Sequence, residues 1–173
     1  MFKKILVANR GEIAVRIIRA CKELNIKTVA IHSNVDTEAM HVKLADESIC
    51  VGSALPNESY LNIPSIISAI DITGADAVHP GYGFLSENDK FAKILSSHKV
   101  KFIGPTSKSI LELGNKSNAL KLASDFKLPI LGNKDSKNID NINDAQKISK
   151  EIGMPVVIKA AYGGGGKGMR VFK

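Results

Sequence analysis

The segment of this chain best suited to chemistry is a glycine run close to its C-terminus. It consists of Gly163, Gly164, Gly165 and Gly166, followed by Lys167 and Gly168. Glycines have no side chain to shield the backbone, so their N–H groups can approach phosphate oxygens closely. Because β-branched residues lie on both sides, the pattern predicts two strands joined by a phosphate-binding loop and disfavours a plain flexible linker.

Two common nucleotide-binding motifs do not fit this run. A P-loop requires Gly-x-x-x-x-Gly-Lys-Ser/Thr between a strand and a helix, but here Ala161 replaces the first glycine and Gly168 replaces the hydroxyl residue. A dinucleotide-binding turn requires three glycines after the first strand, whereas Gly11 is the only glycine in residues 8–14. The remaining interpretation is a strand, a glycine hairpin and a second strand, with the hairpin folded over nucleotide phosphates.

Two lysines are candidates for binding those phosphates. Lys159 ends the first of the two predicted strands, and Lys116 begins a predicted helix after Gly114 and Asn115. An ammonium group is a compact point charge that suits phosphate oxygens. A lysine such as Lys116, taken alone, is most often a solvated surface residue, so its assignment depends on the rest of the pattern.

The elements that must position these residues follow from the hydrophobic pattern. In the first hundred residues, short β-branched runs alternate with amphipathic stretches, which predicts an α/β fold with a parallel sheet covered by helices on both faces. Strands are predicted at residues 4–8, 27–31, 48–51, 77–79 and 100–103. Helices are predicted at residues 12–24, 37–45, 63–73 and 87–97. Since ligands bind at the carboxyl ends of such strands, residues 9–12 and 79–83 are expected to line a site.

Two details of the pattern are predictions about the core. Ile13, Ile17, Ala20 and Leu24 recur at helical spacing in the first helix, and Cys21 also falls on the predicted apolar face. Cys21 and Cys50 lie far apart and form no CxxC spacing, so we expect two buried, reduced thiols.

The pattern changes after residue 105. We expect a doubly wound N-terminal domain at residues 1–112 and the start of a second, incomplete domain at residues 113–173. The later elements are predicted as helices at 106–113, 116–126 and 145–152, a polar stretch at 132–143, and strands at 155–159 and 169–172. So few elements bury too little apolar surface for a complete domain.

The net charge of +7 does not indicate nucleic-acid binding. Residues 1–98 carry 10 basic and 11 acidic side chains, and residues 99–173 carry 14 and 6. The lysines of the second part are dispersed, without a basic run or interleaved aromatics, as on a solvated surface. No stretch approaches the ~20 apolar residues of a membrane helix, and the first residues do not form a signal peptide. We therefore expect a cytoplasmic protein that binds neither nucleic acid nor membrane.

Several segments together resemble the biotin carboxylases, the ATP-grasp subunits or domains of the biotin-dependent carboxylases. The most specific is HPGYGFLSEN at residues 79–88. The other matching segments are residues 4–14, 41–42, 45–47, 59–62, 102–105, 158–160 and 163–170. The resemblance covers essentially the whole chain, and it implies an N-terminal biotin carboxylase domain followed by the truncated start of an ATP-grasp domain.

The resemblance implies a reaction in which ATP and bicarbonate form carboxyphosphate, whose carboxyl group passes to N1 of carrier-bound biotin. By motif position, Lys116 and Lys159 would bind ATP phosphates, and Met169 would pack near the adenine. The four consecutive glycines would form a lid, in which the main chains of Gly165 and Gly166 are the expected direct contacts.

The resemblance also places Tyr82 and Glu87 near the biotin and carboxyl-transfer site. His79 is expected to be a hydrogen-bonded structural histidine and receives no catalytic role. The family's Mg²⁺-binding glutamates, its bicarbonate-binding residues and its arginine near biotin would lie beyond residue 173. We therefore assign no catalytic residue and no metal ligand in this chain, and we expect the 173 residues alone to be inactive.

Three positions depart from the family's pattern. Asn115 replaces an aspartate before Lys116, Leu131 replaces a proline, and Tyr162 replaces a small residue before the glycines. The loss of the acid changes the charge around Lys116, and the larger Tyr162 could restrict the hinge of the lid.

Within the family, residues 20–24 and 59–68 resemble the biotin carboxylase subunit of bacterial acetyl-CoA carboxylase. This similarity implies a biotin carboxyl carrier protein and carboxyltransferase subunits as partners, a homodimer at full length, and a role in fatty acid biosynthesis. Propionyl-CoA, methylcrotonyl-CoA and pyruvate carboxylases share most of these motifs, so the biotin carboxylase part of one of these enzymes stays an alternative identity for the chain. Two other classes also stay open, namely a non-catalytic assembly module and an ATP-grasp ligase with a different substrate.

Overall fold

The computed structural model describes residues 1–130, 139, 141–159 and 168–173. The chain forms two compact units, Met1–Ile110 and Leu111–Lys173.

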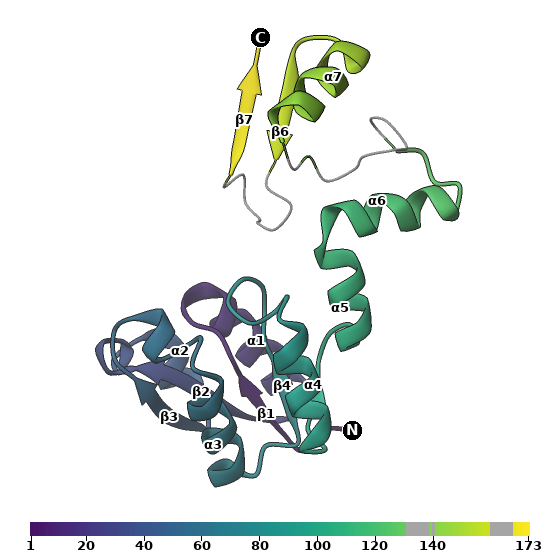
Figure 1. Ribbon diagram of the computed structural model, residues 1–173. Helices are drawn as coiled ribbons and strands as arrows, with labels where there is room; N and C mark the ends of the chain where they lie inside the picture. Colours follow the sequence, from purple (N-terminus) through teal and green to yellow (C-terminus); the bar gives the residue numbers. More distant parts are fainter. Residues whose placement is uncertain (131–138, 140, 160–167) are drawn as a thin grey trace. The chain divides into compact units, whose positions relative to one another are not determined.

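The first unit contains a five-stranded parallel sheet (Figure 1), which confirms the predicted α/β class. Its strands are β1 (Lys4–Val7), β2 (Lys27–Ser33), β3 (Glu47–Gly52), β4 (Ala77–His79) and β5 (Lys101–Phe102). The strand order is β3-β2-β1-β4-β5. The chain therefore proceeds outward from β1 to β3, returns to the other side of β1 and continues with β4. This reversal leaves a crevice at the carboxyl ends of β1 and β4, where ligands of open α/β sheets bind.

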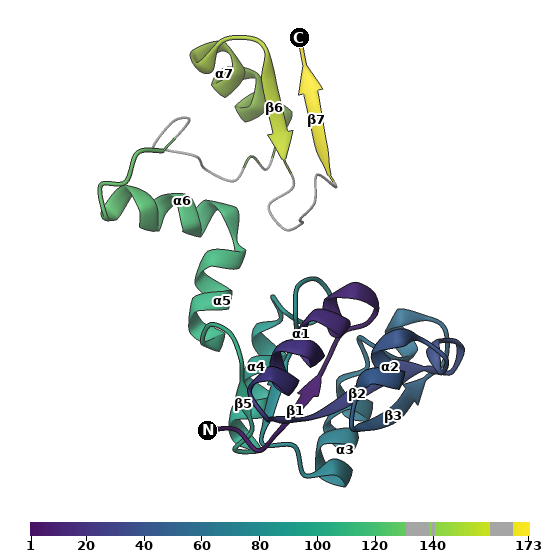
Figure 2. The same cartoon turned by 180° about the vertical axis from the view of Figure 1, so that it is seen from behind.

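Helices pack on both faces of the sheet, which Figures 1 and 2 show from opposite sides. The helical segments of this unit are α1 (Gly11–Glu23), η1 (Asn34–Asp36), α2 (Met40–Leu44), η2 (Pro56–Glu58), α3 (Ile63–Thr73) and α4 (Asp89–Ser97). Successive residues of a strand point to opposite faces. Ile5 and Val7 accordingly pack in a cluster with Ala14 of α1, whereas Leu6 packs in a second cluster with Ile66 of α3.

The predicted buried face of the first helix is wrong in part. The buried residues of α1 are Ala14, Ile18 and Cys21, while Ala20 is exposed and Leu24 is 58% exposed. Helical spacing alone gives several candidate faces on a helix with scattered apolar residues. The contact with Ile5 and Val7 selects the face that includes Cys21.

The prediction that both cysteines are buried holds for Cys21 and is wrong for Cys50. Cys50 pairs with His32 in the register of β3 with β2, an edge strand with its neighbour. On β3, the alternate residues Ile49 and Val51 pack into the cluster below α3. Cys50 points to the other face, where this edge strand is exposed.

Several predicted helix starts are shifted because asparagine side chains cap the first turns. Asn88 Oδ1 accepts a hydrogen bond from the N–H of Phe91, so α4 begins at Asp89 and not at residue 87. Asn141 caps Asp144 in the same way, so the helix expected to start at residue 145 already begins at Ile142. The helix expected at residues 37–45 shortens to α2, since residues 37–39 form a turn after η1 and Ala39 is extended at the start of α2.

The described residues beyond β5 form helices and one strand pair. The elements are α5 (Ser107–Gly114), α6 (Lys116–Asp125), α7 (Ile142–Ile152), β6 (Val156–Lys159) and β7 (Met169–Phe172). β6 and β7 pair in antiparallel register, as predicted for the strands on either side of the glycine run. Within the described segments, no helix is long and apolar enough to cross a membrane.

Candidate functional site

The strongest candidate site is an open pocket of about 460 Å³ at the carboxyl ends of β1 and β4. Two loops form it, one between β1 and α1 and the other after β4. The lining residues are Asn9, Arg10, Gly11, Glu12, Ile13, Tyr82, Gly83 and Phe84. This is the edge of the sheet at which the sequence predicts a site.

Asn9 connects the two loops from within the core. Its side chain is almost fully buried, at 1% exposure. The Nδ2 group donates to the carbonyl oxygens of Pro80 at 2.7 Å and Tyr82 at 2.9 Å. Its Oδ1 accepts a hydrogen bond from the Arg10 N–H at 2.9 Å. The two bonds from Nδ2 therefore hold the loop after β4 beside the loop after β1, while the bond to Oδ1 is local to the first loop.

Gly81 allows the second loop to approach the first. Its φ is +64°, and a Cβ atom at this position would lie 2.6 Å from Ile13 Cγ2 and 2.8 Å from Asn9 Nδ2. Both separations are too short for any larger residue unless the Ile13 and Asn9 side chains shift. The close contact between the loops therefore requires glycine at this position for steric and conformational reasons.

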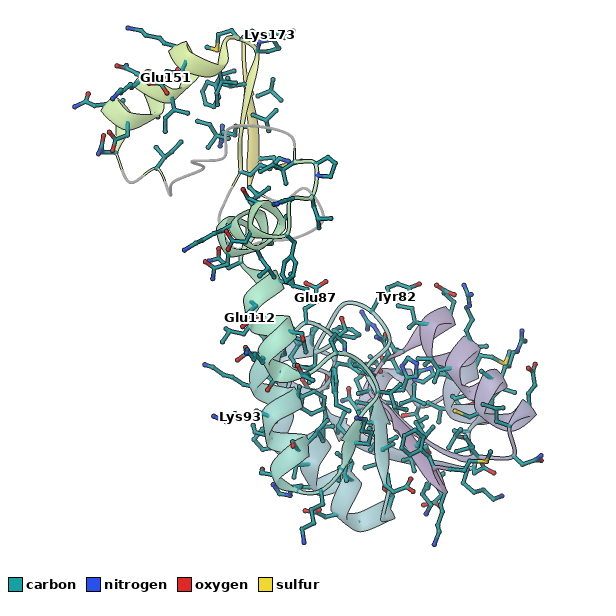
Figure 3. All side chains as sticks on the ribbon, turned by 90° about the vertical axis from the view of Figure 1, so that its right-hand side faces the viewer. Tyr82, Glu87, Lys93, Glu112, Glu151 and Lys173 are labelled. Carbon is teal, nitrogen blue, oxygen red and sulfur yellow. The ribbon has the colours of Figure 1, made fainter. Side chains whose placement is uncertain are left out.

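Tyr82 and Glu12 close the rim of the pocket from opposite sides, Glu12 in the first turn of α1 and Tyr82 in the loop after β4. The Tyr82 hydroxyl donates a hydrogen bond of 2.6 Å to Glu12 Oε1. This hydrogen bond, together with burial and the negative charge of Glu12, raises the pKa of Tyr82 above its ordinary value, so the phenol is protonated at neutral pH. Figure 3 shows Tyr82 and Glu87 in the same loop region; Glu87 is exposed and does not line the pocket.

His79 ends β4 beneath this loop and has a structural contact. Its Nδ1 accepts a hydrogen bond of 3.0 Å from the N–H of Gly81. Burial lowers the pKa of His79, so the neutral form that can accept this bond is favoured. The hydrogen-bonded histidine expected from the sequence is confirmed.

A cluster around Arg10 was not predicted from the sequence. The Arg10 guanidinium carbon lies 5.3 Å from the ring centroid of Tyr60 and 5.6 Å from that of Phe84. The two rings stack at 5.2 Å with an interplanar angle of 12°. Asp36 Oδ2 lies 3.7 Å from Arg10 Nη1 and accepts a hydrogen bond of 2.5 Å from the Tyr60 hydroxyl. These residues come from four separate segments, so no local pattern indicates the cluster.

The Asp36 carboxylate carries the negative charge of this cluster. Burial raises the pKa of Asp36, but hydrogen bonds from Tyr60 and Ser33 and the charge of Arg10 lower it, and the net shift is downward. Burial and the hydrogen bond to Asp36 raise the pKa of Tyr60 to about 12. The cluster at neutral pH is therefore a carboxylate, a neutral phenol and a guanidinium.

The residues expected to bind ATP lie in the second unit. Lys159 ends β6 opposite Met169, which begins β7, and both residues are exposed. Lys116 is the first residue of α6, and its side chain lies outside the described part of the chain. Gly163, Gly164, Gly165 and Gly166 also lie outside the described residues.

The chain belongs to the biotin carboxylase family. The family described as "Biotin carboxylase, N-terminal domain" matches residues 1–110, and "Carbamoyl-phosphate synthase L chain, ATP binding domain" matches residues 115–173. The chain is 52% identical to the biotin carboxylase of Haemophilus influenzae, covering 100% of this chain and 39% of that protein. It is 54% identical to the mitochondrial propionyl-CoA carboxylase alpha chain of Caenorhabditis briggsae, covering 98% of this chain and 23% of that protein.

Solved structures support the same family. A biotin carboxylase from Campylobacter jejuni in complex with "beta-gamma-ATP" superimposes with a TM-score of 0.93 at 48% identity, over 99% of this chain and 38% of that one. A second solved structure is the biotin carboxylase domain dimer of Hydrogenobacter thermophilus 2-oxoglutarate carboxylase in complex with MgADP, ADP and bicarbonate. It superimposes with a TM-score of 0.94 at 46% identity, over 99% of this chain and 37% of that one. The chain thus spans about two fifths of the length of these biotin carboxylase chains.

Proposed function

We propose that this chain is the N-terminal part of an ATP-dependent biotin carboxylase that serves an acetyl-CoA carboxylase. In this reaction ATP and bicarbonate form carboxyphosphate, and the carboxyl group is then transferred to N1 of biotin on a carrier protein. The observation that carries the proposal is the pocket at the β1 and β4 strand ends, whose second wall is formed by the family's most specific segment, residues 79–88. The carrier protein, the carboxyltransferase subunits and a second copy of the chain are its proposed partners.

The pocket suits the bicyclic, weakly polar ring system of biotin. Its walls combine apolar surface from Ile13 and Phe84 with a few fixed polar groups, as is typical of small-molecule sites. Tyr82 lies at the rim as a neutral phenol whose proton is directed at Glu12. In this proposal Tyr82 orients the biotin ring, and Glu87 lies further along the same loop.

We assign nucleotide binding to the second unit, with a domain division at residues 112 and 113. Lys159 and Met169 are direct neighbours across the antiparallel strand pair, so their side chains project from the same face. A positive charge beside an apolar thioether suits a ligand with phosphates at one end and an adenine at the other. Lys116 and the lid residues Gly163, Gly164, Gly165 and Gly166 complete the proposed ATP site.

We propose that the carboxylates that bind Mg²⁺ in this reaction lie outside the described residues of this chain. Among the described residues there is no group of three or more His, Cys, Asp or Glu side chains that could hold a metal ion, whereas Mg²⁺ bound with phosphates requires carboxylate ligands. We propose that the 173 residues alone are inactive. Turnover would also require a polypeptide that corresponds to the rest of the related biotin carboxylases, of which this chain covers about two fifths.

The test is a chimera in which this chain replaces the matching part of Haemophilus influenzae biotin carboxylase. ATP hydrolysis that depends on both biotin and bicarbonate is the expected result, together with no detectable turnover by the 173 residues alone. Faster carboxylation of the acetyl-CoA carboxylase carrier than of the propionyl-CoA carboxylase carrier is expected as well. Biotin-independent ATP hydrolysis with ammonia as acceptor would refute the proposal and favour a carbamoyl-phosphate-forming ligase, the class named by the match at residues 115–173.

A further inference from the structure

Arg10 has no part in the reaction proposed above, yet its side chain lies against one wall of the pocket. Its guanidinium contacts the rings of Tyr60 and Phe84, with the carbon 5.3 and 5.6 Å from their centroids. A planar cation beside ring faces combines cation–π attraction with stacking, which an ammonium group cannot reproduce. Arg10 therefore connects the loop after β4 with the segment that precedes α3.

Asp36 holds the Tyr60 side of this contact in place and lies beside Arg10. Its Oδ2 atom accepts hydrogen bonds from the Tyr60 hydroxyl at 2.5 Å and from Ser33 Oγ at 2.7 Å, and it lies 3.7 Å from Arg10 Nη1. Tyr60 itself is fully buried, and its hydroxyl also accepts a hydrogen bond from the Ser33 N–H at 3.1 Å. The ring on which Phe84 stacks is thus held rigidly by the core.

The loop that carries Phe84 is not fixed by its own backbone preferences. Gly81, Gly83 and Phe84 all have positive φ, at 64°, 71° and 41°. This conformation is easily adopted by glycine but is unfavourable for a bulky residue such as Phe84. Contacts of the Phe84 side chain must therefore stabilise this backbone conformation. The Phe84 ring stacks on Tyr60 and contacts the Arg10 guanidinium.

We infer that Arg10 is a positioning residue for the biotin side of the pocket. Its guanidinium holds the Phe84 ring against Tyr60 and so fixes the main chain of Tyr82 and Gly83, which form the pocket wall. The identity of the ligand rests on the proposed function. The contact of the Arg10 guanidinium with the Phe84 ring, called the clamp below, does not depend on it.

Amide hydrogen exchange in the 173-residue chain tests the clamp directly. The Ser86 N–H, bonded to Gly83 O at 2.9 Å, reports on the loop, and the Ala8 N–H, bonded to the carbonyl oxygen of His79 at 2.9 Å, reports on the sheet. Replacing Arg10 by methionine is expected to accelerate exchange at Ser86 about tenfold relative to Ala8. R10K keeps the charge without the planar group, and is expected to have an intermediate effect.

The matched control is Lys93→Met, which removes an exposed positive charge from α4. It is expected to leave both amides unchanged. If Arg10→Met leaves the ratio of the two exchange rates unchanged, or accelerates both amides equally, the clamp is refuted. The second outcome would mean that Arg10 only contributes to global stability.

The chimera adds a kinetic readout that a purely structural role would not change. In Arg10→Lys, the KM for free biotin is expected to rise about fivefold, while the KM for ATP changes less than about twofold. An equal rise in both KM values, or no change in either, overturns the positioning role. A chimera that is inactive with Arg10 retained refutes the proposed function, and the exchange experiment then still decides the clamp.

Discussion

The hydroxyl of Tyr82 donates a hydrogen bond to Glu12 at 2.6 Å, across 70 positions of sequence. Glu12 lies in the first turn of α1, and Tyr82 follows β4. The two residues meet because β1 and β4 are adjacent parallel strands whose carboxyl ends lie at the same edge of the sheet. Their hydrogen bond spans the rim of the candidate biotin pocket.

Removing the charge of Glu12 should lower the pKa of Tyr82. The hydrogen bond to the Glu12 carboxylate stabilises the protonated phenol and opposes the phenolate, so Glu12→Gln is expected to return the Tyr82 pKa toward the ordinary value of about 10. Tyrosinate absorbance measures this shift cleanly, because the chain has three tyrosines and no tryptophan. Tyr82→Phe identifies the transition, and an unchanged titration in Glu12→Gln would contradict the assignment.

Gly81 and Gly83 form a matched pair that separates steric from conformational effects. Both have positive φ, but only at Gly81 would a Cβ atom clash, with Ile13 and Asn9. We expect Gly83→Ala to lower the free energy of unfolding by about 1 kcal/mol through backbone strain alone. Gly81→Ala should lower it by about 3 kcal/mol, since overpacking adds to the same strain. Equal values from urea unfolding would show that the two loops are not in close contact.

The buried amide of Asn9 should matter more for stability than its size suggests. Replacing Asn9 by alanine removes the donor for the carbonyl oxygens of Pro80 and Tyr82. We expect a loss of about 2–3 kcal/mol in the free energy of unfolding, because buried acceptors are left unsatisfied. Asn57→Ala, at an exposed position in η2, is the control and should change stability by less than about 0.5 kcal/mol.

Asp46 provides a pH-dependent contribution to stability. The hydrogen bond from Lys27 is the main cause that lowers the pKa of Asp46 to about 2. Burial alone would raise this pKa, whereas the hydrogen bonds from Thr28 lower it further. A carboxylate with a lowered pKa stabilises the fold above its unfolded pKa of about 4, and the contribution is lost as the pH falls towards 2. After allowance for solvent screening, Asp46→Asn should cost about 1 kcal/mol at pH 7.

The effect of Asp46→Asn should shrink steadily between about pH 4 and pH 2. Urea unfolding at a series of pH values measures it. Asp71→Asn, at an exposed position of α3, is the control and should show no such dependence. If the free energies of unfolding of the wild type and Asp46→Asn differ by the same amount from pH 4 to pH 2, the ionised Asp46 carboxylate does not stabilise the fold through its hydrogen bonds.

Lys159 should contribute to nucleotide affinity if the second unit binds ATP. Lys159→Met removes the charge at the end of β6 and keeps an unbranched side chain. In the chimera we expect the Kd for ATP to rise about tenfold, equivalent to about 1.4 kcal/mol. Lys147→Met removes an exposed charge from α7 and should leave the Kd unchanged. Equal affinities of the two variants would remove Lys159 from the proposed site.

Periodicity in the sequence was enough to predict the alternation of strands and helices, the parallel sheet and the sheet edge at which residues 9–12 and 79–83 lie. These features depend on local hydrophobic spacing and on the rule that ligands bind at strand carboxyl ends. The antiparallel strands on either side of the glycine run were predicted from local spacing as well. The roles of Tyr82 and Glu87 near biotin rest on the family resemblance and stay predictions. The roles of Lys116, Lys159, Met169 and the four glycines stay predictions.

Which distant side chains meet depends on the packing of the whole chain. The stacking of Arg10 with Tyr60 and Phe84 joins residues 50 and 74 positions apart, and it exists because the strand order brings three loops together. The same strand order leaves Cys50 exposed on an edge strand, although its β-branched neighbours predict burial. Periodicity indicates which residues share a face, but burial also requires a neighbouring element over that face, and this depends on how the whole chain packs.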